Sequence, residues 1–126
     1  MKSYHSDLDL MNGIDPIEFI INSKTEFLHI FKKYARTSSR DFTQRERLAF
    51  SRGFAFDMNN YRLQLMCCQF KLHGEAEGLL SVLLAFMDEA WDYRNVPDRK
   101  IVSVADDIVN AYISLADWLA LRTSKT

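Results

Sequence analysis

The sequence contains few residues that turn or cross-link a chain: 4 glycines, 2 prolines and 2 cysteines among 126 residues. An all-β domain needs turn-forming residues after every short strand, so this scarcity argues against such a domain. The two cysteines, Cys67 and Cys68, are neighbours in the sequence. Because adjacent cysteines bridge only through a strained ring, we expect reduced core thiols and a cytoplasmic protein.

Long apolar runs and an excess of one charge are missing as well. The longest uninterrupted apolar run extends only from Val82 to Met87, whereas a membrane-spanning helix needs about 20 such residues. The first ten residues lack the apolar segment of a secretory signal. The net charge is −1, from 16 basic and 17 acidic residues. We therefore expect no membrane contact and no global attraction to nucleic acid.

Apolar residues recur at helical spacing along most of the chain, and this periodicity predicts four helices. Their expected ranges are 16–36, 44–73, 75–94 and 104–122. Asp15 with Pro16 and Thr43 with Glu46 are start signals for the first two helices. Gly53 interrupts the second pattern and marks a candidate break. We expect an all-α, single-domain four-helix bundle over residues 15–126, preceded by a short N-terminal arm over residues 1–14.

The second predicted helix carries apolar residues on two opposite faces. One face is expected to be in the core and consists of Phe50, Phe54, Met58, Tyr61, Leu65, Cys68 and Leu72. The other face carries Phe56, Leu63, Met66 and Phe70. Either this helix is central and buried on both sides, or the second face is a dimer or partner interface, because exposed apolar patches with charged rims are typical of interfaces.

Charge is distributed unevenly along the chain. Residues 1–31 carry a net charge of −3, residues 32–72 carry +6 and residues 73–126 carry −4. The helices could neutralise one another, or each charged segment could meet a partner. A nucleic-acid patch would use the arginines Arg40, Arg45, Arg47 and Arg52. An acidic edge for a basic protein such as a nuclease would use Asp88, Glu89, Asp92, Asp106, Asp107 and Asp117.

Two short motifs keep other functions open. Glu75 and Glu77, followed by the pattern Glu89-x-x-Asp92, resemble part of the metal site of all-α nucleotide pyrophosphatases, which use Glu-x-x-Glu and then Glu-x-x-Asp on consecutive helices. The resemblance implies a Mg²⁺-dependent hydrolase if the four carboxylates converge, although Glu75 and Glu77 are two residues apart instead of three. The spacing Ala49-x-x-x-Gly53 is typical of a helix-turn-helix unit and favours a nucleic-acid-binding regulator.

The sequence shows no nucleophile loop, no phosphate loop and no set of metal ligands with a recognised spacing, so we expect no catalytic residue, metal or cofactor. The leading hypothesis is a non-enzymatic, cytoplasmic protein-binding module of the small inhibitor, immunity, antitoxin or regulator type. Such a protein acts by sequestering a protein partner, and a homodimer is an open alternative. The nucleotide hydrolase and the nucleic-acid binder remain the other two hypotheses.

Overall fold

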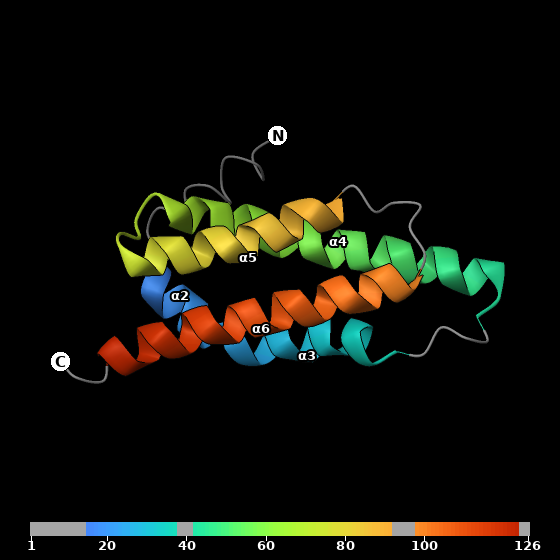
Figure 1. Cartoon of the computed structure of the whole chain (residues 1–126), viewed down its shortest axis with the longest axis horizontal. Helices are drawn as coiled ribbons and strands as arrows, with labels where there is room; N and C mark the ends of the chain where they lie inside the picture. The colour runs from blue at the N-terminus through green and yellow to red at the C-terminus, as the bar shows by residue number, and fades with distance from the viewer. Residues whose placement is uncertain (1–14, 38–41, 92–97, 124–126) are drawn as a thin grey trace.

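The computed structural model describes residues 15–37, 42–91 and 98–123 (Figure 1). All regular structure in these ranges is helical, which confirms the all-α prediction. The helices are α2 (Pro16–Asn22), α3 (Lys24–Arg36), α4 (Gln44–Gln69), α5 (Glu75–Trp91) and α6 (Asp98–Thr123). The described part of the chain therefore contains five helices where four were expected. The N-terminal arm predicted at residues 1–14 lies outside the described residues.

The extra helix arises because the first predicted helix is divided at Ser23. The Asp15 side chain accepts a hydrogen bond from the amide of Ile17 at 2.9 Å, and Pro16 follows at the first helical position, which confirms the predicted start. Asn22 and Ser23 are weak helix formers, so the interruption falls where local helix propensity is lowest. The break is slight, since the Ser23 amide still bonds to the carbonyl of Phe19 at 3.0 Å.

Three other predictions about helix bounds are wrong. The helix predicted to end at 73 ends at Gln69, where a turn follows at residues 70 and 71. Helix α4 runs unbroken through Gly53, so the candidate break and the turn of a helix-turn-helix unit are both absent from residues 44–69. Helix α6 begins at Asp98, six residues before the predicted start at 104. The reason is tertiary: Ile101 is fully buried, one turn before the buried Ala105, and so extends the inward face of α6 toward its N-terminus.

Aromatic side chains fill the space between α3 and α4. Phe27 lies 5.0 Å from Tyr61 and Phe31 lies 6.2 Å from Phe54, measured between ring centroids, and both contacts are edge-to-face. Tyr112 of α6 stacks on Phe27 at 4.0 Å. Edge-to-face and offset contacts of this kind are favourable beyond the area they bury. Helix α6 packs along both α3 and α5, and α5 packs along α4, so the core lies between these four helices (Figure 1).

The predicted inward face of α4 is confirmed for all but one residue. The buried members are Phe54, Met58, Tyr61, Leu65, Cys68 and Leu72, while Phe50 is half-buried. The capping box is also confirmed, because Thr43 and Glu46 exchange side-chain to backbone hydrogen bonds. Among the described helices, none is both long and apolar enough to cross a bilayer.

Three tyrosine hydroxyls tie the helices together. Tyr34 donates to Asp57 at 2.6 Å and Tyr61 donates to Glu26 at 2.5 Å, and each bond joins α3 to α4. Tyr112 donates to the carbonyl of Ile20 at 2.7 Å. Burial is the main cause that raises the pKa of all three phenols above the usual value, and at Tyr34 and Tyr61 the bonded carboxylate raises the pKa further.

These raised pKa values predict a loss of stability in alkali. A tyrosine whose pKa is higher in the folded than in the unfolded chain stabilises the fold fully below the unfolded value, and this contribution is lost as the pH rises above about 10. We expect the free energy of unfolding, measured with urea, to fall between pH 9 and pH 11. The Tyr61→Phe variant should show a shallower fall than the parent protein. Equal slopes for the two proteins would contradict this assignment.

The environment of Gly53 predicts a second stability effect. A Cβ at Gly53 would lie 3.1 Å from the Tyr34 hydroxyl, which the bond to Asp57 holds in place, whereas a Cβ at Gly78 meets nothing within 4 Å. Gly78→Ala should therefore raise the free energy of unfolding by about 0.5–1 kcal/mol. Gly53→Ala should give a smaller gain or a loss in the parent protein. The same substitution made in a Tyr34→Phe background, which lacks the hydroxyl, should give the full gain relative to that background. Identical gains at both glycines would show that the hydroxyl exerts no constraint.

Candidate functional site

The outer face of α4 exposes large apolar side chains. Phe56 is 74% exposed, Leu63 52%, Met66 38% and Phe70 85%. Phe56, Leu63 and Phe70 are seven residues apart, an interval that returns to the same helix face after two turns. Phe70 follows the last residue of α4 but keeps helical backbone angles (φ −71°, ψ −15°), so the row continues to it. We call these four residues the α4 stripe.

The α4 stripe has no part in the core. The opposite face of α4 already supplies the buried side chains, among them Met58 and Leu65, which are fully buried. The expectation that this helix is buried on both sides is therefore wrong for the described structure. Contiguous exposed apolar residues mark interaction sites more often than isolated ones do. Leu48, 47% exposed, stands on the same helix nearer its N-terminus.

The predicted basic patch is only partly assembled. Arg45 and Arg52 are exposed and seven residues apart, and they lie in line with the α4 stripe toward the helix N-terminus. Arg47 is two residues from Arg45, which places it on the opposite side of the helix, and its Nε donates to the Phe42 carbonyl at 3.4 Å. Arg40 lies outside the described residues. The structure thus joins two of the four arginines to the apolar stripe.

The predicted acidic residues do not gather on one edge of the described structure. Asp88 of α5 bonds to Arg62 of α4 at 2.6 Å, and Asp117 of α6 bonds to Lys24 of α3 at 2.7 Å. Asp107 lines the groove between α5 and α6. Asp106 and Glu89 are exposed, and Asp92 lies outside the described residues. The sequence offered no signal for Lys24 or Arg62 as partners, because they are 93 and 26 residues from the aspartates they bind.

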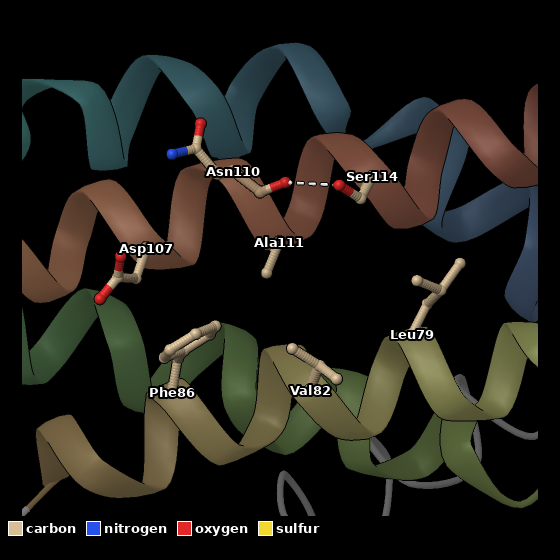
Figure 2. A pocket seen from close by; sticks show the side chains of 7 residues that line it. All are labelled: Leu79, Val82, Phe86, Asp107, Asn110, Ala111 and Ser114. Carbon is tan, nitrogen blue, oxygen red and sulfur yellow. Dashed lines mark hydrogen bonds between the residues drawn. The ribbon is translucent and has the colours of Figure 1, made fainter.

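The groove between α5 and α6 has an apolar wall and a partly polar wall (Figure 2). Its α5 wall consists of the apolar side chains Leu79, Val82 and Phe86. Its α6 wall carries Asp107, Asn110 and Ser114 beside Ala111, and the Ser114 hydroxyl donates to the Asn110 carbonyl at 3.1 Å. The volume is about 230 Å³, whereas pockets that enclose drug-sized ligands begin near 300 Å³.

The carboxylates of the hydrolase hypothesis do not converge within the described residues. Glu75, Glu77 and Glu89 all belong to α5, and fourteen residues separate the first from the last, about 21 Å along a helix that rises 1.5 Å per residue. The described ranges contain no group of three or more histidine, cysteine, aspartate or glutamate side chains that could hold a metal ion.

The environment of Cys68 does not favour nucleophilic chemistry. Cys68 is buried, and burial is the main cause that raises the pKa of its thiol to about 11. A thiol with a raised pKa is present as the unreactive, protonated form at neutral pH. Cys67 is half-buried, and both cysteines are free of disulfides.

Comparison of the chain with models of known protein families, with curated protein sequences and with solved structures gives no match. The α4 stripe, with Arg45 and Arg52 at one end, is the largest group of exposed apolar side chains in the described residues that share one helix face.

The two faces of α4 predict effects of very different size for the same substitution. Phe54→Ala removes a buried ring and should lower the free energy of unfolding by about 3–5 kcal/mol. Phe56→Ala, two residues away, removes an exposed ring and should change the free energy of unfolding by less than about 0.5 kcal/mol. Urea unfolding followed by circular dichroism measures both values. A large loss for Phe56→Ala would mean that the stripe supports the fold instead of a partner.

Proposed function

We propose that this protein is a non-enzymatic protein-binding module whose docking surface is the α4 stripe. The observation that carries the proposal is the row of Phe56, Leu63 and Phe70, which are exposed on one helix face although the core has no use for them. Exposure of aromatic side chains to water is unfavourable, and aromatic residues often anchor protein interfaces. Within this class we favour the inhibitor, immunity, antitoxin or regulator type that sequesters a protein partner.

The stripe suits a partner that presents a helix. Apolar residues at intervals of seven match a second helix packed along α4 with the same repeat. Arg45 and Arg52 favour acidic residues on the partner at the end that meets the α4 N-terminus. This partner differs from the basic protein expected from the acidic edge, because Asp88 and Asp117 already bind Arg62 and Lys24 of the same chain.

We propose that α2 and α3 act together as one of four helical columns, since the break at Ser23 keeps the hydrogen bond from its amide to Phe19. The free thiols of Cys67 and Cys68 support a cytoplasmic location.

Single-stranded nucleic acid is the second candidate partner. Arg45 and Arg52 lie in line with the exposed ring of Phe56. In proteins that bind single strands, bases stack on such rings while basic side chains contact the phosphates. Against it, Arg47 points away from this row. Nucleic-acid binding would weaken steeply with salt, whereas binding of a protein through the apolar stripe would weaken much less.

The proposal predicts that a photo-crosslinking amino acid placed in the stripe captures protein. With p-benzoylphenylalanine at position 56 or 63, irradiation of cells or lysate from the protein's own source should give a discrete protein adduct, identified by mass spectrometry. The adduct at position 56 should be lost when Leu63→Asp is added. The same probe at position 121, which is exposed on α6, serves as the control and should give no adduct of that mass.

Absence of any protein adduct at both stripe positions would overturn the proposal. An adduct that nuclease removes would favour the second candidate.

A further inference from the structure

The three residues of the stripe that are seven positions apart are arranged symmetrically about Leu63. Phe56 and Phe70 each lie seven residues from Leu63, so the row has a phenylalanine, a leucine and a phenylalanine at equal intervals. A surface that meets a copy of itself across a two-fold axis has to be self-complementary, with residue i on j and j on i. A row that is symmetric about its central residue satisfies this condition when two helices run antiparallel.

We infer that the occupant of the α4 stripe is a second copy of this chain, packed antiparallel along α4 with the two-fold axis at Leu63. This inference rests on the proposed function and specifies its partner. Leu63 then meets Leu63 of the second copy, and Phe56 meets Phe70 of the second copy. Met66 falls level with Asn60, at the edge of the same contact, so each copy covers the apolar residues of the other.

The charges at the ends of the stripe decide whether the two α4 helices pack parallel or antiparallel. In a parallel pair with the same alignment, Arg45 would oppose Arg45 and Arg52 would oppose Arg52, and facing like charges oppose association. In the antiparallel pair, Arg52 is carried to the turn that joins α4 to α5 in the second copy. The exposed carboxylates Glu75 and Glu77 lie in the first turn of α5. Lys71 lies in the same turn, so the segment that Arg52 meets carries a net charge of −1. Arg52 is attracted to this segment, whereas it would be repelled by Arg52 of a parallel copy.

The area of the stripe sets the expected strength. From their exposed fractions, the four side chains offer roughly 500 Å² per copy, so a dimer would bury about 1,000 Å². This area is below the range of stable specific interfaces and within that of weak ones. An interface of this size with two aromatic anchors on each side gives a reversible dimer, with a dissociation constant on the order of micromolar. A foreign partner that uses the stripe would have to displace the second copy.

Sedimentation equilibrium of the full chain tests the dimer. The parent protein should change from monomer to dimer as its concentration rises from about 1 to 300 µM, a range that brackets a micromolar dissociation constant. Leu63→Asp places two carboxylates face to face at the axis and should weaken the dimer by roughly 100-fold or more. Leu121→Asp is the matched control, because Leu121 is a similarly exposed leucine but belongs to α6 and not to the stripe. It should dimerise like the parent.

A parent protein that stays monomeric throughout this range would overturn the inference, and so would equal losses for the two variants. Circular dichroism should show the same helical content in both variants, since both sites are exposed.

Disulfide trapping tests the direction and register. In a background with Cys67→Ser and Cys68→Ala, Leu63→Cys should form a disulfide-linked dimer under mild oxidation. Phe56→Cys alone should form none, but a mixture of Phe56→Cys and Phe70→Cys chains should form a mixed dimer. A disulfide between two Phe56→Cys chains would overturn the antiparallel alignment at Leu63.

The two proposals fail in different ways. If sedimentation shows only monomers while the crosslinker at position 56 still captures another protein, the second copy is the wrong partner and the protein-binding function stands. If the crosslinker captures neither a second copy nor another protein, both proposals fall.

Discussion

The packing of aromatic rings between α3 and α4 is the constraint on which the rest of the structure depends. Phe27 and Phe31 are fully buried against rings of α4. A buried hydroxyl needs a hydrogen-bond partner, so Tyr61 has to reach Glu26 and Tyr34 has to reach Asp57. These requirements hold α4 at one rotation about its own axis. They also favour a residue without a side chain at Gly53, which lies beside the Tyr34 hydroxyl.

The rotation of α4 decides what the protein shows to its surroundings. With Phe54, Met58 and Leu65 turned inward, a helix of 3.6 residues per turn has to place Phe56 and Leu63 outside. Exposure of the stripe is thus a consequence of the core, whereas its apolar composition is not, because polar residues at the same positions would leave the packing unchanged. That composition is the reason to assign the stripe to binding.

The uneven charge of the sequence is partly neutralised within the fold. Two aspartates bind basic residues on neighbouring helices, Asp88 to Arg62 and Asp117 to Lys24. Exposed ion pairs of this kind contribute only about 0–1 kcal/mol each to stability. Their main effect is on the surface: they neutralise two acidic side chains at separate helix contacts. Arg45 and Arg52 stay in line with the apolar row.

Local rules determined much of this protein from its sequence: the helical class, the caps at Asp15 and Thr43, and the division of α4 into two apolar faces. Caps and helical periodicity involve residues a few positions apart, so they can be read along the chain. Only tertiary structure decided four other features: the continuity of α4 through Gly53, the early start of α6 at Asp98, the partners of the aspartates and the exposure of the stripe. Each depends on a side chain or helix far away in sequence, and helical periodicity cannot tell how many neighbours a helix will have.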